Sequence, residues 1–164
     1  MKRFPVLLLL ILSLGFVSRD SITLKDFKPA FGRWKGSLTY LDYSSGKPYT
    51  MPANITISPD PSNDKHLILA FEYPDEPKAN GNDTLVISND GSMIDEALVI
   101  SKKRTGSKEL SITTEKEGVD GNDNRKATIR HIYSIGKRKF TSRKEVRFEG
   151  GADFILRNEF RMSR

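Results

Sequence analysis

The sequence predicts an all-β protein built as a single antiparallel, up-and-down β-barrel of about 8–10 strands. From Phe31 onward apolar and polar residues alternate in most windows, as they do in antiparallel strands with one buried face. Turn sequences rich in Gly, Pro, Asn and Asp separate these windows at ~8–12 residue spacing, and helical periodicity is almost absent. Such short links favour strands that pair in chain order, and closure of the sheet removes its exposed edges. The length of 164 residues is typical of one domain.

Residues 1–18 have the layout of a secretory signal peptide. Lys2 and Arg3 precede an apolar run over residues 6–14, and polar residues begin at Ser18. The run is shorter than the ~20 residues of a membrane span, so we expect a cleaved leader, with an uncleaved anchor as the alternative. This pattern predicts export to the periplasm or to the outside of the cell. The chain contains no Cys, which favours a bacterial protein, because small secreted eukaryotic domains usually carry disulfides.

Residues 19–30 are expected to form an N-terminal plug, and residues 31–164 to form the barrel. Phe27 and Phe31 supply the segment that begins at Leu24 with aromatic side chains suited to covering the barrel floor. The predicted strands lie in the windows 34–40, 51–57, 67–73, 98–100, 110–112, 129–133, 140–148 and 154–162. Turns are expected at 44–48, 59–63 and 89–92, and longer polar loops at 74–83 and 118–124.

The first predicted strand opens with Gly32-Arg33-Trp34, and the chain ends with basic residues that include Arg161 and Arg164. This combination resembles the lipocalin and calycin superfamily, in which a Gly-x-Trp motif begins strand one and a basic residue near the end of the last strand packs across the Trp. The resemblance implies that Trp34 closes the barrel floor, with Arg161 or Arg164 as the cation over its indole ring. The chain has no evident helix after the barrel and no helix pair over its top, so the ligand of the family is not carried over.

If the apolar phase faces inward, several polar residues share the barrel interior with it. The candidate ligand-binding residues are Trp34, Tyr40, His131, Tyr133, Lys144 and Asn158. The expected apolar lining is Leu38, Met51, Ile55, Leu67, Leu69, Phe71, Leu110, Ile112, Ile129, Val146, Phe148, Leu156 and Phe160. An apolar cavity with a few convergent polar groups is the usual composition of a small-molecule site. An inward Lys144 requires an anion from a ligand or from a protein carboxylate; the alternative is that it extends to the rim while His131 and Tyr133 pair with each other.

On the last two predicted strands, the residues that alternate with the apolar ones are mostly charged. They are Arg143, Glu145, Arg147, Arg157, Glu159 and Arg161. We expect them on the outer surface, where opposite charges on adjacent strands form cross-strand pairs. The alternative reverses the faces of the barrel, so that these residues line a polar pocket for a carboxylate or phosphate.

The balance of 27 Lys and Arg against 21 Asp and Glu gives a net charge of +6, with basic clusters at 102–104 and 137–139. The aromatic residues follow the core phase and are not interleaved with the basic ones, so we expect no nucleic-acid binding. An anionic envelope surface is the macromolecular partner that this charge suits, but a solvated basic rim without a partner is the preferred explanation.

Motifs for other chemistry are absent from the sequence. The segment from Asp120 departs from a calcium-binding loop at its sixth and twelfth positions, Arg125 and His131, so we expect no metal site, and no cofactor motif is present. The preferred function is an exported, non-enzymatic binding protein that holds a small apolar or amphipathic molecule. The alternatives are a barrel enzyme that uses Tyr40, His131 or a pair of Glu145 with an Arg as acid and base on a small organic acid, and a filled barrel that acts through its surface in the envelope.

Overall fold

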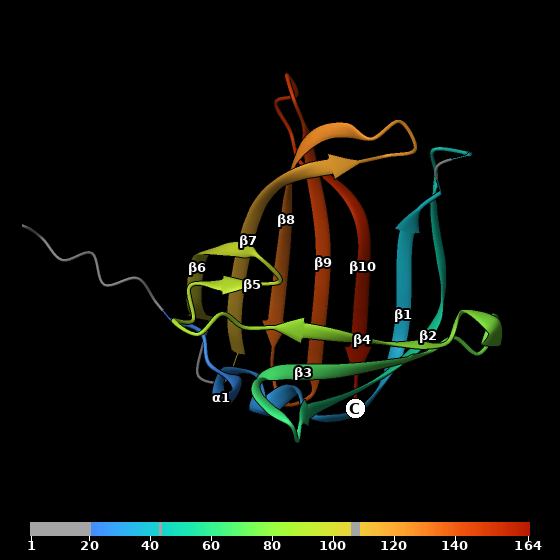
Figure 1. Ribbon diagram of the computed structural model, residues 1–164. Coiled ribbons are helices and arrows are strands. Elements are labelled where there is room, and N and C mark those ends of the chain that lie inside the picture. The colour runs from blue at the N-terminus through green and yellow to red at the C-terminus, as the bar shows by residue number, and fades with distance from the viewer. Residues whose placement is uncertain (1–20, 43, 106–108) are drawn as a thin grey trace, which may run out of the picture.

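The computed structural model describes residues 21–42, 44–105 and 109–164, and within them ten strands form one antiparallel sheet that curls into a nearly closed barrel (Figure 1). The predicted all-β, up-and-down fold is confirmed. The predicted signal peptide, residues 1–18, lies outside the described residues. The helices and strands are α1 (Leu24–Phe27), the 3-10 helices η1 (Lys28–Ala30) and η2 (Pro77–Ala79), β1 (Gly32–Leu41), β2 (Pro48–Asp60), β3 (Asn63–Glu72), β4 (Gly81–Val86), β5 (Met93–Ile94), β6 (Ala97–Thr105), β7 (Glu109–Asp120), β8 (Arg125–Ile135), β9 (Lys139–Phe148) and β10 (Ile155–Ser163). None of the described helices is long and apolar enough to cross a membrane.

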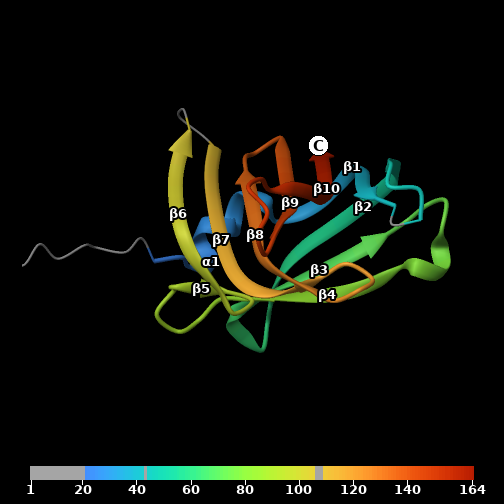
Figure 2. The same ribbon diagram turned by 90° about the horizontal axis from the view of Figure 1, so that it is seen from above.

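Strands that follow one another in the chain also pair in the sheet, and β1 pairs with β10 to join the two halves of the barrel wall. The order is β4-β3-β2-β1-β10-β9-β8-β7-β6-β5, so the sheet begins and ends at the short strands β4 and β5. These two ends meet through the bridge between Ile87 and Ile94 and through hydrogen bonds of Val86 with Asp95 and of Ser88 with Met93, including Asp95 N–H to the Val86 carbonyl at 2.9 Å. From above, the tall strands β6 to β10 curve round to β1 and β2, with β3 and β4 crossing the other side (Figure 2).

The end of the barrel at which α1 lies, called the lower end here as in Figure 1, is filled and covered by the N-terminal segment. Phe27 of α1 is only 2% exposed, and its ring lies edge-on to Tyr133 with a centroid distance of 6.0 Å. Trp34 is 1% exposed, packs against Phe140, and donates its indole N–H to the carbonyl of Ala30 at 2.6 Å. Burying large apolar side chains such as these stabilises the fold by about 1.5–3 kcal/mol each.

A cation lies over the floor Trp, as the calycin resemblance implies, and it comes from Arg164. The Arg164 guanidinium is 4.1 Å from the Trp34 ring centroid and donates hydrogen bonds to the carbonyls of Pro29, Phe31 and Lys137. Arg161, the other candidate, donates instead to Glu159 at 2.6 Å. Arg164 therefore ties the end of the chain to the N-terminal plug and to the turn between β8 and β9.

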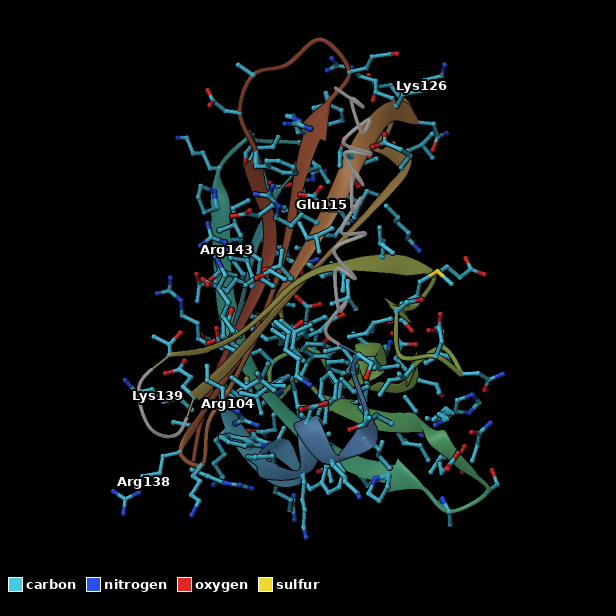
Figure 3. The ribbon with its side chains drawn as sticks, turned by 90° about the vertical axis from the view of Figure 1, so that its left-hand side faces the viewer. Arg104, Glu115, Lys126, Arg138, Lys139 and Arg143 are labelled. Carbon is cyan, nitrogen blue, oxygen red and sulfur yellow. The ribbon has the colours of Figure 1, made fainter. Side chains whose placement is uncertain are left out.

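The charged phase of β9 and β10 lies mostly on the outer surface, where its members pair. Arg143 contacts Glu145 at 2.9 Å and Arg161 contacts Glu159, while the neighbouring strands add a pair between Arg130 and Glu115. Figure 3 shows Glu115 and Arg143 part-way up this wall, with Arg104, Arg138 and Lys139 at the lower end of the barrel. The interpretation with reversed faces is therefore wrong for Arg143, Glu145, Glu159 and Arg161.

Two β-bulges displace residues from the faces that simple alternation predicts. In β10 the pairing with β9 shifts between Leu156 and Asn158, so Leu156 pairs with Glu145 of the outer face and Arg157 becomes the extra residue. Leu156 is therefore not part of the inner lining, and Arg157 does not belong to the outer charged face. In β6 a shift between Val99 and Ser101 leaves Leu98 and Ile100 outside, 40% and 48% exposed.

The two predicted long loops are shorter than expected because strands extend into them. β4 already begins at Gly81, and β7 continues to Asp120, which pairs with Arg125 of β8. Gly121 takes a φ of +85°, which a glycine adopts without strain, and so allows the tight turn between these strands.

Candidate functional site

The upper half of the barrel contains two neighbouring spaces that share one lining residue. The deeper one, called the chamber here, has a volume of about 170 Å³. It is lined by Ile55, Leu69, Phe71, Asp83, Leu85, Asp95, His131, Tyr133, Phe140, Ser142, Asn158 and Phe160. The upper one, called the mouth, has a volume of about 460 Å³ and is lined by Tyr40, Leu41, Asp42, Ser44, Asn122, Lys144, Arg157 and Asn158. Asn158 lines both spaces.

The register of the strands explains why these side chains meet. Directly opposed residues of an antiparallel pair point to the same face of the sheet. His131 lies opposite Lys144, Tyr133 opposite Ser142, and Lys144 opposite Asn158, so one inward row crosses β8, β9 and β10. Tyr40 continues the row on β1, because it pairs with Asn158.

His131 and Tyr133 form the polar wall of the chamber. Their rings stack with a centroid distance of 6.2 Å and an interplanar angle of 17°. Burial, together with the ammonium groups of Lys144 and Lys116, lowers the pKa of His131 to about 4. Burial and the negative charges of Asp95 and Asp83 raise the pKa of Tyr133. At neutral pH the chamber therefore presents a neutral imidazole and a protonated phenol, both suited to hydrogen bonding with a guest.

Two carboxylates stand at the β4–β5 side of the chamber. Asp83 lies opposite Leu69 on the inner face of β4, and Asp95 accepts a hydrogen bond from the backbone N–H of Val86 at 2.7 Å. Burial raises the pKa of Asp95, and the neighbouring charge of Asp83 adds to that effect. Lys116 donates to the backbone carbonyl of Asp95 at 2.8 Å, so this side of the chamber also contains a cation.

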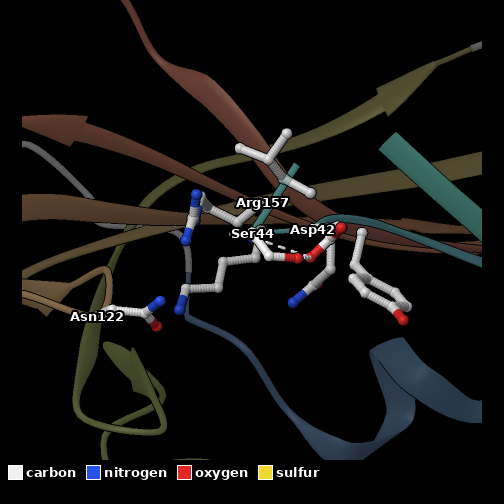
Figure 4. A pocket seen from close by; sticks show the side chains of 8 residues that line it. Asp42, Ser44, Asn122 and Arg157 are labelled. Carbon is white, nitrogen blue, oxygen red and sulfur yellow. Dashed lines mark hydrogen bonds between the residues drawn. The ribbon is translucent and has the colours of Figure 1, made fainter. Parts of the chain in front are cut away.

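The mouth is organised around an ion triad of Lys144, Asp120 and Arg157. The Lys144 ammonium lies 3.2 Å from one Asp120 oxygen, and Arg157 Nε lies 2.7 Å from the other. The anion that an inward Lys144 requires is thus a protein carboxylate in this structure. Asp42 also lines the mouth and accepts a hydrogen bond from Ser44 (Figure 4). A second hydrogen bond comes from Ser45, and together these bonds lower the pKa of Asp42 to about 2.

The structure brings five of the six predicted ligand-binding residues to the hollow. Tyr40 and Lys144 line the mouth, His131 and Tyr133 line the chamber, and Asn158 lines both. Trp34 lines neither space, because it is buried in the floor beneath them.

Sequence reasoning missed several residues of the hollow. Asp83 fell in a predicted loop, Arg157 was displaced by the bulge, and Asp95 follows a two-residue strand with a φ of 50°. Ser142 could have been predicted from the sequence. It lies two residues from both Phe140 and Lys144, and therefore on the same face of the strand. Thr114 was also missed: it pairs with His131, is 1% exposed, and its hydroxyl has no hydrogen-bond partner among the described residues.

No group of three or more His, Asp or Glu side chains in residues 21–42, 44–105 and 109–164 is arranged to hold a metal ion. No family model matches the sequence, and no curated protein matches it. Among solved structures, the chain is similar to the crystal structure of Rv2717c from M. tuberculosis. That similarity has 12% sequence identity and a TM-score of 0.49, and it covers 86% of this chain and 96% of the other.

Proposed function

We propose that this protein is an exported, lipocalin-like binding protein that holds a small apolar or amphipathic molecule inside its barrel. The observation that carries the proposal is the chamber of about 170 Å³, which shares the lining residue Asn158 with the mouth of about 460 Å³. A concave, largely apolar space with a few convergent polar groups is the usual composition of a small-molecule site. Export is supported by the layout of residues 1–18, and kinship with calycins by Gly32-x-Trp34 and by the Arg164 cation over Trp34.

The lining of the chamber suits an amphipathic guest. Phe71 and Phe160 contact each other with a centroid distance of 5.2 Å, and His131 and Tyr133 add an imidazole and a phenol to the same lining. A ligand that carries both apolar and hydrogen-bonding groups therefore finds partners for both in the chamber. The largely filled lower half supports the fold and leaves the upper half as the place for the guest.

The test is native mass spectrometry of the chain, purified gently from its own envelope. We expect extra mass that is lost on denaturation, and a thermal stability that rises when the released molecule is added back. A bare protein mass, with no binding to extracted lipids or small acids, would contradict the proposal and favour a barrel that acts through its surface.

A pair of variants distinguishes binding in the chamber from binding elsewhere. Ser142→Leu places a larger apolar side chain in the chamber, whereas Ser134→Leu makes the same change on the outer face of the neighbouring strand. We expect Ser142→Leu to lose the bound mass and Ser134→Leu to keep it. Loss in both variants, or in neither, would show that the chamber is not the site.

A further inference from the structure

The lower end of the barrel carries a group of exposed cations where β1 begins and where β8 turns into β9. Arg33 and Lys35 come from β1, and Lys137, Arg138 and Lys139 lead from β8 into β9. All five side chains are exposed, and these five residues are called the basic edge here. Arg138 and Lys139 lie at the lower end of the barrel in Figure 3, far from Lys126 at the opposite end.

The strand register places the two strand lysines of the basic edge in one outer row. Lys139 lies opposite Ser163, Ser163 opposite Lys35, and Lys35 opposite Asn54. Directly opposed residues share a face of the sheet, and this face is the outer one because the neighbouring Trp34 is buried inside. Lys35 and Lys139 are therefore two strand spacings apart, about 10 Å, on one continuous surface.

Arg164 fixes the turn of the basic edge beside the floor of the barrel. Its backbone N–H donates to the carbonyl of Arg138 at 3.3 Å, and its guanidinium donates to the carbonyl of Lys137 at 2.9 Å. The same guanidinium donates to the carbonyl of Phe31, directly before β1. The backbone therefore holds the cations of the turn next to those of β1, without carboxylates between them.

Carboxylates do little to neutralise the basic edge. In the part of the chain that the structure describes, its one ion pair joins Arg33 to Glu72 at 3.8 Å, between side chains that are 80% and 50% exposed. Such an exposed pair contributes little attraction. The other carboxylates at this end lie on separate elements: Asp26 on α1, Asp60 and Asp64 at the turn between β2 and β3, and Glu109 on β7. Positive charge therefore dominates along the basic edge.

A cleft of about 620 Å³ opens in the basic edge. Each side chain of its lining carries an N–H or O–H donor, and no Asp or Glu is among the described residues that form it: Arg33, Trp34, Lys35, Asn54, Thr56, Ser163 and Arg164. Trp34 and Arg164 already donate to backbone carbonyls, whereas the other five side chains are neutral or cationic donors beside the cleft. A phosphodiester, which carries a negative charge and acceptor oxygens, matches this lining.

We propose that the basic edge binds the phosphate head groups of an anionic phospholipid bilayer, which docks the barrel on a membrane with its mouth turned away. Each Lys or Arg close to an anionic bilayer adds to the attraction. Nucleic acid is the poorer candidate, because the aromatic rings beside the basic edge, Trp34 and Phe140, are buried and cannot stack on bases. This inference goes beyond the proposed function: it uses the proposed export but not the chamber.

The test is co-sedimentation of the chain with vesicles of phosphatidylcholine, either alone or with about one third phosphatidylglycerol. We expect binding to the anionic vesicles that weakens as salt is added, because salt screens the attraction. Lys137→Gln/Arg138→Gln/Lys139→Gln should weaken this binding at least about ten-fold. The matched control is Lys47→Gln/Arg125→Gln/Lys126→Gln, which removes two lysines and one arginine at the opposite end and should keep the binding.

The two vesicle types separate the basic edge from the apolar run of residues 6–14, because a retained apolar segment would bind both. Equal binding to neutral and anionic vesicles would overturn the inference, and so would equal losses in the two triple variants. Arg33→Gln/Lys35→Gln tests the cleft separately and should also weaken binding, with circular dichroism to show that each variant folds.

Two further outcomes would assign the basic edge to a different partner. Tighter binding to duplex DNA than to the anionic vesicles at the same salt concentration would reject a lipid partner. Salt-sensitive self-association without vesicle binding would assign the surface to a second copy of this chain. None of these results changes the native mass measurement, so failure of the docking inference and failure of the proposed function are distinguishable.

Discussion

Arg164 joins three separate stretches of the chain through one side chain. Its guanidinium lies over Trp34 and donates to the carbonyls of Pro29, Phe31 and Lys137. A planar guanidinium supplies several donors in fixed directions, whereas an ammonium is a compact point charge. The floor of the barrel therefore depends on the shape of this side chain as well as on its charge.

We expect Arg164→Gln to lower the free energy of unfolding by about 2 kcal/mol, because it removes a cation over an aromatic ring and leaves carbonyls without donors. Arg164→Lys should recover only part of the loss. Arg33→Gln is the control, since Arg33 is the neighbour of Trp34 in β1 but its side chain is 80% exposed. Urea unfolding gives the free energy of unfolding of the three variants and of the wild type. An equal loss for Arg33→Gln would contradict the role assigned to Arg164.

His131 makes the stability of the fold depend on pH. Its folded pKa of about 4 lies below the ordinary value of 6.5, so between these values the unfolded chain binds the proton more readily. Stability contributed by the neutral ring is therefore complete above pH ~6.5 and falls as the pH drops towards 4, by up to about 3 kcal/mol.

His131→Gln should flatten this dependence, because glutamine does not titrate. Urea unfolding of the wild type and of the variant at pH 7 and pH 4.5 tests the prediction. Parallel losses in both proteins would assign the effect to other groups. Titration of the His131 ring by NMR gives a second reading, and a pKa at or above 6 would contradict the burial argument.

The seam between β1 and β10 is the element on which closure of the barrel depends. Gly36 pairs with Met162 there, and a Cβ at Gly36 would lie 2.0 Å from the backbone carbonyl oxygen of Arg161. No real Cβ approaches a backbone atom so closely, so any larger residue must push the two strands apart. Glycine at this position permits the close approach of the first and last strands, β1 and β10.

Gly36→Val is expected to destabilise the fold by about 3 kcal/mol or more, as for other backbone-level clashes in a core. Gly81→Val is the matched control, because a Cβ at Gly81 meets nothing within 4 Å and Gly81 lies at the start of an edge strand. Thermal unfolding followed by circular dichroism compares them. A similar loss in both variants would show that the seam is not the cause.

The alternation of apolar and polar residues and the positions of turn-forming residues were sufficient to predict three features. These are the all-β fold class, the pairing of strands in chain order and most of the inward-facing residues. His131, Tyr133 and Lys144 share an inward row because nothing interrupts β8 or β9 there. The inward position of Arg157 could not be predicted, because one added residue in β10 changes which side of the strand each neighbour occupies. Asp83 and Asp95 were missed because the segments around them carry turn-forming residues and only short strands.

At the scale of the whole molecule, the barrel has a filled lower half and a hollow upper half, and the N-terminal segment seals the filled end. Ile22 docks on the turn at Gly91 through a backbone hydrogen bond of 2.9 Å, and Phe27 enters the core. The plug and the barrel therefore share one core and should unfold together.

Phe27→Ala is expected to cost about 3–5 kcal/mol and to keep a single unfolding transition. Val119→Ala is the control, because Val119 is 53% exposed on β7. Denaturant unfolding followed by both fluorescence of Trp34 and far-UV circular dichroism tests this prediction. Two separate transitions in the wild type would contradict a shared core.

The junction of β4 and β5 has a consequence for how quickly a guest is exchanged. This junction holds through one bridge and through hydrogen bonds of Val86 with Asp95 and of Ser88 with Met93, and the ladder between β5 and β6 has two residue pairs. The junction borders the chamber through Leu85 and Asp95. Local opening is least costly where few hydrogen bonds must break. We therefore expect the wall to open first around β5, and we expect a ligand in the chamber to exchange at a rate that depends on this local opening.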